Sequence, residues 1–242
     1  MDESEHFYLV FQPIVRICGQ NAVGFEEFEV LLRSMKTQKF PADIFHEILE
    51  NENKYNKYMN WFKLELEQQI KEHPNIKFSI NIDIDQFRFG STFQFLEYFS
   101  QYHHQLIIEI TEHTPKNDPE LLLALESILK KIKACNYKIA IDDYTAGINT
   151  FASYKSNRQY YDRVKIMFLG YKSVLYILGF VIYANIMRFF FSKRIEIVVE
   201  RIDSLRKSRI TKSLSVCLQQ GYYFGTEKNI IRGKTDHDCY EG

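Results

Sequence analysis

The feature that most constrains the fold is a repeated alternation of short apolar runs with longer segments of helical periodicity. The short runs, which we expect to form β-strands, are residues 7–15, 28–32, 76–82, 106–110, 138–142, 163–167, 195–199 and 221–224. Between them, apolar residues recur at steps of three and four, as on one face of an amphipathic helix. The expected helices are residues 41–49, 58–70, 93–102, 119–135, 174–187 and 206–218. Repeated strand–helix units with apolar strands favour a largely parallel sheet covered by helices.

Eight strands in 242 residues indicate a (β/α)8 TIM-like barrel, although the pattern alone does not exclude an open sheet. We find no linker, internal repeat or shift in composition. We therefore expect a single domain over residues 1–225, followed by a polar, weakly ordered tail over residues 226–242. Gly and Pro together supply only 15 residues and apolar residues 45% of the chain, which excludes collagen-like, low-complexity and disordered classes.

The charges and cysteines limit the binding partners and the cellular compartment that we expect for this protein. Because 31 Lys and Arg balance 31 Asp and Glu, no global basic field attracts a nucleic-acid polymer or an anionic membrane. The apolar run at residues 174–187 is shorter than the roughly 20 residues that span a bilayer, so we expect a core helix there. The acidic N-terminus has no secretory signal, which favours a cytoplasmic protein. The cysteines lack the spacing of a zinc site or a disulfide framework (Cys18, Cys135, Cys217 and Cys239).

Polar side chains interrupt or end most of the apolar strands, each on a different strand. They are Glu29, Asn81, Glu109, the pair Asp142 and Asp143, Lys165 and Glu200. A carboxylate buried in a barrel strand is unfavourable unless a positive charge compensates it. Since the carboxyl ends of parallel barrel strands converge on one mouth, we expect these groups to share a cation site. Taken one at a time, each is equally compatible with a salt bridge or a strand-end cap.

The chemistry of this set points to hard cations. Its ligands are oxygen atoms, with no His or Cys among them, which suits Mg²⁺ or Mn²⁺ better than Zn²⁺. Two adjacent aspartates, Asp142 and Asp143, can serve two ions about 4 Å apart, an arrangement that activates water for phosphoryl displacement. Lys165 would offset negative charge on the phosphate or on the attacking hydroxide.

The order of short motifs resembles the EAL-domain family of cyclic di-GMP phosphodiesterases over residues 11–225. The motifs, in chain order, are FQPIV (11–15), EVLLR (29–33), SIN (79–81), EITE (109–112), IDDY (141–144), VKI (164–166), VVE (198–200) and QGYYFG (220–225). Each motif is weak alone, but eight in the family's order are specific. The resemblance implies a barrel with an atypical, antiparallel first strand and hydrolysis of cyclic di-GMP to linear pGpG.

The resemblance also assigns roles to residues. Metal-ligand positions fall on Glu29, Asn81, Glu109 and Asp142, with Asp143 at the position that serves a second ion. Lys165 falls on the catalytic lysine position, and Glu200 on that of a glutamate that binds metal or helps to activate water. Substrate-contacting positions fall on Gln12, Arg33 and Gln220, and Glu112 matches a glutamate that anchors the following loop.

Four departures from the family pattern stand out. Met167 replaces the aspartate of K-I-D, which removes a carboxylate beside the metal ligands, and Asp203 replaces the last glutamate of E-G-V-E. The loop after the aspartate pair reads Tyr144-Thr145-Ala146-Gly147 in place of F-G-T-G, which bears on how that loop couples dimerisation to metal binding. Val30 replaces the alanine of E-A-L and keeps the glutamate.

The leading hypothesis is a phosphodiesterase that uses Mg²⁺ or Mn²⁺, acts on cyclic di-GMP and works alone or as a homodimer. The alternative is a degenerate module that binds cyclic di-GMP or a protein without turnover, which Met167 and the altered loop favour. A barrel enzyme for another phosphodiester is a third reading. Among the aromatic residues, Tyr144 and Tyr222 are candidates for stacking on guanine, and His113 lies near the expected mouth without an assigned role.

Overall fold

The computed structural model describes residues 7–18, 21–191 and 194–225, so the expected tail at 226–242 lies outside the described residues. Its strands are β1 (Phe7–Cys18), β2 (Asn21–Ser34), β3 (Lys77–Ile82), β4 (Leu106–Ile110), β5 (Lys138–Ile141), β6 (Arg163–Met167), β7 (Glu196–Glu200) and β8 (Leu218–Gln220). They close into a barrel in chain order, with β8 paired to β1. The predicted barrel is confirmed.

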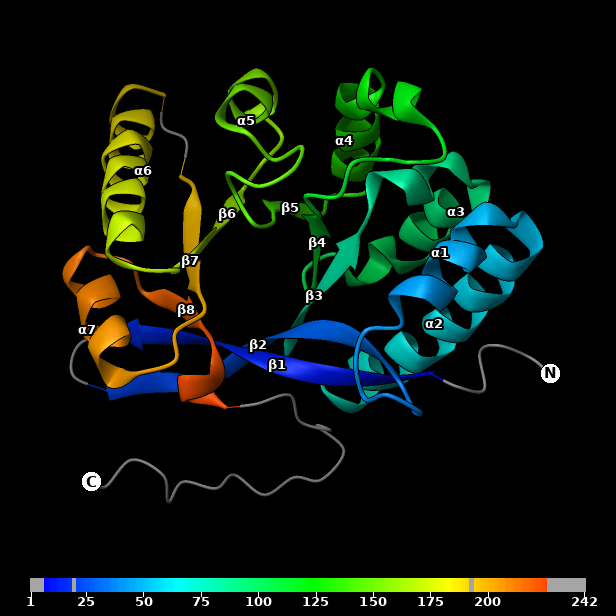
Figure 1. Cartoon of the computed structure of the whole chain (residues 1–242), viewed down its shortest axis with the longest axis horizontal. Coiled ribbons are helices and arrows are strands. Elements are labelled where there is room, and N and C mark those ends of the chain that lie inside the picture. The colour runs from blue at the N-terminus through cyan, green and yellow to red at the C-terminus, as the bar shows by residue number, and fades with distance from the viewer. Residues whose placement is uncertain (1–6, 19–20, 192–193, 226–242) are drawn as a thin grey trace.

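The first strand runs against its neighbours. β1 pairs antiparallel with both β2 and β8, whereas the other neighbouring strands pair in parallel. The expected antiparallel first strand is therefore confirmed. In Figure 1 the β1–β2 ribbon (blue) runs beneath the rest of the barrel, between α1 and α2 at one end and α7 at the other.

Helices cover the outside of the barrel between successive strands. They are α1 (Ala42–Glu50), α2 (Glu52–Glu72), α3 (Gly90–Phe99), α4 (Leu125–Ala134), α5 (Phe151–Asn157), α6 (Tyr171–Phe191) and α7 (Leu205–Ser213). Local sequence starts several of them. The Asn51 side chain accepts hydrogen bonds from two backbone N–H groups at the start of α2, and the Thr150 side chain accepts one, from Ser153 N, at the start of α5.

Buried side chains of the strands and helices form one large core, and Ile14, Val198 and Leu218 form a small separate cluster. In β4 all five residues are buried, because helices cover its outer face and the barrel interior its inner face. The aromatic residues that we assigned to apolar faces pack largely in this core. For example, Tyr55, Phe78 and Phe99 are fully buried.

Three local expectations were wrong. The last strand is Leu218–Gln220, and the predicted strand at 221–224 is a single 3-10 turn at Tyr222–Phe224. The predicted helix at 206–218 accordingly ends at Ser213 as α7. The short helix α5 was not predicted. The helix expected from Pro119 is present as a 3-10 turn, Pro119–Leu122, followed by α4.

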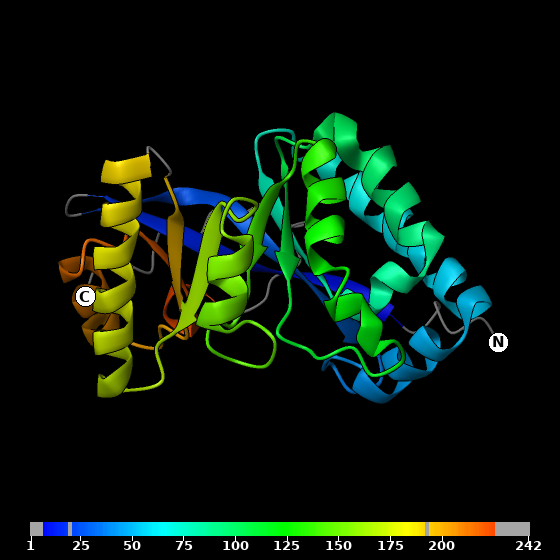
Figure 2. The same cartoon turned by 90° about the horizontal axis from the view of Figure 1, so that it is seen from above.

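Helix α6 lies at the outer edge of the molecule, beyond α5 (Figure 2). Its Ile177 and Phe180 side chains are buried against the barrel, but Leu175, Ile182 and Phe189 are exposed. The expectation of a core helix therefore holds for one face only. In the described part of the chain, its stretch Lys172–Phe189 is long and apolar enough to cross a membrane by length and composition, with 22% of that stretch buried. Such a helix packed on a barrel is weak evidence for a membrane span.

Candidate active site

The barrel brings the predicted site residues together at one mouth. Glu29, Asn81, Glu109, Lys165 and Glu200 lie on β2, β3, β4, β6 and β7, and Asp142 and Asp143 directly follow β5. The parallel registers place Asn81 beside Glu109. The site residues share the interior side of their strands near this end, since residues two apart on a strand face the same side. Gln12 on β1 and Gln220 on β8 complete the ring.

Lys165 lies at the centre of this ring. Its Nζ donates hydrogen bonds to Oε2 of Glu29 at 3.0 Å and to Oε2 of Glu109 at 2.7 Å. The same Nζ lies 3.0 Å from Oδ1 of Asp142 and 2.9 Å from Oε1 of Glu200. Four carboxylates from four different parts of the barrel thus meet one buried ammonium group.

Glu29 is held from three sides. Asn81 donates from Nδ2 to Oε1 of Glu29 at 2.6 Å, and Gln220 donates from Nε2 to Oε2 at 2.6 Å. Gln220 Nε2 also donates to Oε1 of Gln12 at 3.1 Å. Burial tends to raise the pKa of Glu29, but the Lys165 charge and the amide hydrogen bonds outweigh it, so the pKa of Glu29 is lowered. Glu29 is therefore an ionised, fixed carboxylate.

The other carboxyl groups are difficult to ionise without further positive charge. Burial, reinforced by Glu29 and other acids, raises the pKa of Glu109 to about 8 and that of Asp142 to about 6. Burial also raises the pKa of Glu200 well above its usual range. Although burial opposes it, the surrounding carboxylates raise the pKa of Lys165, which keeps its charge. The single positive charge of Lys165 does not balance the negative charges that these carboxyl groups carry when ionised.

The donor set fits divalent cations. If all four carboxylates around Lys165 ionise, three negative charges remain uncompensated, and Asp143 adds a fourth. Carboxylate oxygens of Asp142, Asp143 and Glu200 lie within 4.8 Å of one another, close enough to share an ion. Buried oxygens without a hydrogen-bond partner also occur here, namely Oδ1 of Asn81, Oε1 of Glu109 and Oε1 of Gln220. Oxygen ligands with excess negative charge suit Mg²⁺ or Mn²⁺.

The loop after β5 holds the aspartate pair in a tight turn. Asp143 has a positive φ of 40°, and the buried Asn149 donates from Nδ2 to the backbone oxygen of Asp142 at 2.6 Å. A Cβ atom on Gly147 would lie 1.9 Å from the backbone oxygen of Glu112. Ile148 N donates to that same oxygen at 3.0 Å. Glu112 thus contacts the loop through its backbone.

A cleft of about 250 Å³ opens beside the carboxylates. Its wall includes Arg33, Asn81, Glu112, Asp142 and Asp143 together with apolar side chains such as Phe40 and Phe62. Arg33 is half-buried and donates to the backbone oxygen of Leu32 at 2.8 Å. The cleft joins a charged floor to an apolar wall, as a site for a nucleotide requires.

The cleft also contains residues to which the sequence assigned no role. His113 Nδ1 lies 3.0 Å from Oδ1 of Asp83, and its Nε2 lies 3.5 Å from Oε1 of Glu112. Thr111 also hydrogen-bonds to Asp83. The hydrogen bond with Asp83 raises the pKa of His113 to about 9. Their positions in the sequence could have identified these residues, because Asp83 and His113 each follow the end of a strand.

Three of the noted departures take definite places. Met167, half-buried, pairs in register with Glu200 across β6 and β7. Asp203 is exposed and accepts a hydrogen bond from Lys207 at 2.7 Å, away from the carboxylate ring.

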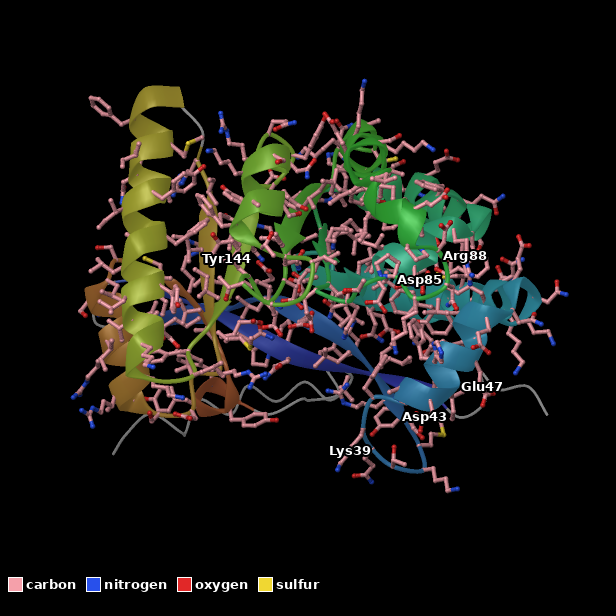
Figure 3. The ribbon with its side chains drawn as sticks, turned by 45° about the horizontal axis from the view of Figure 1, so that its top comes forward. Lys39, Asp43, Glu47, Asp85, Arg88 and Tyr144 are labelled. Carbon is pink, nitrogen blue, oxygen red and sulfur yellow. The ribbon has the colours of Figure 1, made fainter. Side chains whose placement is uncertain are left out.

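Tyr144 is buried, with its ring 5.0 Å from that of Phe180 on α6, so stacking on guanine is not open to it here. Figure 3 shows it on the flank opposite Asp85 and Arg88. Tyr222 is exposed.

Comparison with known proteins agrees with this geometry. The family model described as EAL domain matches residues 2–227. A search of curated proteins finds no match.

Solved structures share the fold. An EAL domain protein from Listeria monocytogenes EGD-e is 22% identical, with a TM-score of 0.67 over 92% of this chain and 88% of that one. The PaMucR phosphodiesterase in complex with c-di-GMP is 18% identical, with a TM-score of 0.69 over 93% and 98%. Klebsiella pneumoniae BlrP1 in a calcium and cyclic di-GMP complex is 18% identical, with a TM-score of 0.68 over 94% and 57%. With its matched residues and its closed barrel, the chain belongs to the EAL domain family.

Proposed function

We propose that this protein is a metal-dependent phosphodiesterase that hydrolyses cyclic di-GMP to linear pGpG. The observation that carries the proposal is Lys165 surrounded by four carboxylates at a barrel mouth beside a cleft. Membership of the EAL domain family and structural neighbours solved in complex with cyclic di-GMP support the choice of substrate.

Glu29, Asn81, Glu109, Asp142 and Asp143 would hold the cations, which we propose to be two Mg²⁺ or Mn²⁺ ions. When bound, such ions lower the pKa of a water molecule and neutralise phosphate charge. Asn81 and Gln220 fix the Glu29 carboxylate through their hydrogen bonds, so that its oxygens are oriented before a ligand arrives. Preorganisation of this kind lowers the cost of reaching the transition state.

The proposed reaction is one in-line displacement. A water oxygen attacks phosphorus and the bond from phosphorus to the ribose 3′ oxygen breaks. The leaving 3′ oxygen takes up a proton from solvent to form a hydroxyl group, and the opened dinucleotide carries a 5′ phosphate. Burial raises the pKa of Glu200 in the metal-free protein, so Glu200 would accept the proton of the water only once bound cations favour its ionised form. Lys165 stabilises the negative charge that develops on the phosphoryl oxygens. Arg33, which lines the cleft, would contact the substrate, as would Gln12 and Gln220 at the edge of the carboxylate ring. Glu112 would position the loop after β5 through its backbone oxygen.

The test is incubation of the purified protein with cyclic di-GMP and Mg²⁺ or Mn²⁺, followed by separation of the nucleotides. We expect linear pGpG with either ion and no product in chelator. Ca²⁺ should support binding but not turnover, because its larger radius and looser coordination misplace the water. Tight binding of cyclic di-GMP without product would instead establish a module that binds without turnover.

We also propose that the active form is a cytoplasmic homodimer with α6 at its interface. Its exposed residues Leu175, Leu178, Ile182 and Phe189 are spaced by three, four and seven, the spacing with which one helix packs against another. In a two-fold dimer, α6 of a second copy would cover these exposed apolar residues. Light scattering should give twice the chain mass for the wild type and the chain mass for Ile182→Glu, with Lys130→Glu on α4 as the control.

A further inference from the structure

A second layer of buried charge lies beneath the carboxylates of the candidate active site. Arg163 on β6 is 2% exposed and Glu27 on β2 is 6% exposed. Arg163 donates from both terminal nitrogens to the two carboxylate oxygens of Glu27, one bond measuring 2.9 Å. Ser79 donates from Oγ to Oε1 of Glu27 at 3.0 Å. Both oxygens of the Glu27 carboxylate therefore accept hydrogen bonds.

The same guanidinium group also reaches the neighbouring strand. Its Nε and one terminal nitrogen donate to Oε2 of Glu196 on β7, at 3.2 and 2.9 Å. Lys138 Nζ lies 3.7 Å from the other oxygen of Glu196. Arg163 thus connects β6 to β7 at its side and to β2 across the barrel.

The two layers repeat one geometry. Glu27 and Glu29 are two residues apart on β2, and Arg163 and Lys165 are two residues apart on β6, so each pair points to the same side of its strand. Arg163 bonds Glu27 as Lys165 bonds Glu29. Two parallel bridges therefore cross the barrel interior, about 6–7 Å apart at the usual rise per residue.

The position of β2 relative to β6 depends on such bridges. In the ring β1 to β8, β2 and β6 are four strands apart in either direction, on opposite sides of the barrel. No ladder hydrogen bond joins them, since each pairs only with its neighbours. Through the backbone, the position of β2 relative to β6 is set by three intervening strands. Small deviations in the tilt of each of these strands add up. A bidentate side-chain bridge sets their separation directly.

Stability alone does not account for this pair. Taking an Arg and a Glu out of water is costly, and well-packed apolar side chains of similar volume often do as well or better. What the charged pair adds is a fixed geometry, because the planar guanidinium group accepts one arrangement against a carboxylate. It also keeps the Glu27 charge neutralised, so that Glu27 does not compete with Glu29 for the ammonium group of Lys165.

We propose that Arg163 is a positioning residue for the site, and that its bridge to Glu27 fixes the separation of Glu29 and Lys165 across the barrel. The inference rests on the proposed function, in which Glu29 is a metal ligand and Lys165 acts on the phosphate. Arg163 itself contacts neither substrate nor metal in this scheme.

The test compares Glu27→Met/Arg163→Met with the wild type. The double variant removes both charges of the bridge and fills similar volume. Glu196 loses its bonds from Arg163 but keeps Lys138 and, with its side chain 25% exposed, contact with solvent, so the melting temperature should stay within a few degrees of the wild type. We expect kcat for cyclic di-GMP to fall by about 10-fold with KM changed less than about 3-fold. We expect the calorimetric Kd for Mn²⁺ to rise by about 10-fold. In its crystal structure, Lys165 Nζ and Glu29 Oε2 should lie beyond about 3.5 Å, outside hydrogen-bond distance.

Two further variants make the result specific. Arg163→Lys keeps the charge but loses the bidentate geometry, and should show the same direction of change in kcat and Mn²⁺ affinity. Lys138→Met removes a cation from the same end of the barrel without breaking the bridge, and should leave both values unchanged. If the double variant and Arg163→Lys both keep wild-type kcat, wild-type Mn²⁺ affinity and the 3.0 Å separation, the proposal is overturned. If the wild type makes no pGpG, the proposed function fails, while the measured separation of Lys165 and Glu29 still decides the positioning role.

Discussion

Nζ of Lys165 lies 2.7 Å from Oε2 of Glu109, and both side chains are shielded from solvent by the barrel. Even so, burial raises the pKa of Glu109 to about 8, so below that pH the metal-free protein keeps this carboxyl group protonated. A divalent cation favours the ionised form and must displace the proton.

We therefore expect Mn²⁺ affinity to rise with pH between 6 and 8, by up to about 10-fold per pH unit for one displaced proton. Calorimetry in two buffers of different ionisation enthalpy counts the protons released. Glu109→Gln, which has no carboxyl proton to lose, should show a shallower pH dependence on top of weaker binding. Equal wild-type affinity at pH 6 and pH 8 would contradict this prediction.

The same shift has a consequence for stability without metal. Since the pKa of Glu109 is raised above its usual 4.5, the native state binds more protons than the unfolded state between about 4.5 and 8. The free energy of unfolding of the metal-free protein should thus fall as pH rises through this window. Thermal melts in chelator test this, with Glu109→Gln as the variant that lacks this contribution. A melting temperature in chelator that rises with pH only in the wild type would count against it.

Glu29 and Lys165 should separate into different kinetic classes. Glu29→Ala removes a proposed ligand, so Mn²⁺ binding and hydrolysis should both weaken, binding by at least about 10-fold. Lys165→Ala removes charge stabilisation in the transition state, so kcat should fall by about 10²-fold or more with a smaller effect on cyclic di-GMP binding. Nucleotide titration beside product chromatography measures both. Hydrolysis by Lys165→Ala at the wild-type rate would show that the proposed mechanism is wrong.

The sequence pattern was informative where strands are buried on both faces. Residues 106–110 are apolar apart from Glu109 and lie where a strand was expected. The last strand was misplaced because Leu218–Gln220 carries two glutamines, whereas the aromatic run after it has the composition of a strand. Gly221 ends that strand at a close approach, since a Cβ there would lie 2.2 Å from the backbone oxygen of Ile202. This contact is not visible in the local sequence.

The limits on predicting the site were of a different kind. Strand ends predicted that Glu29, Glu109 and Lys165 converge, because a parallel barrel leaves little choice. The bond from Arg163 to Glu27 joins residues 136 positions apart on opposite strands, and only closure of the barrel brings them together. Likewise, α6 is apolar on all sides, so its periodicity did not reveal that one face is exposed.

Met167 is a departure that the structure places beside Glu200. It is half-buried and in register with Glu200, so an aspartate there would add a carboxylate beside the proposed ligands. If this position limits metal binding, Met167→Asp should raise Mn²⁺ affinity or kcat by about 10-fold, the scale on which such neighbouring groups act. Met167→Leu controls for the change in packing. Unchanged affinity and rate in Met167→Asp would show that the position is not limiting.

The ion pair of His113 with Asp83 should contribute stability in a pH-dependent way. The hydrogen bond with Asp83 raises the pKa of His113 from its usual 6.5 to about 9. A histidine whose native pKa is raised stabilises the fold fully below its unfolded pKa, and this contribution is lost as pH rises through the native value. Because the His113 side chain is 61% exposed, solvent screens the pair and its contribution is under about 1 kcal/mol.

We expect His113→Gln to lower the melting temperature by about 1–3 °C at pH 6 and by nothing measurable at pH 10. Asp83→Asn should give the same pattern, and a wild-type advantage that persists unchanged at pH 10 would rule out the charged pair as its source.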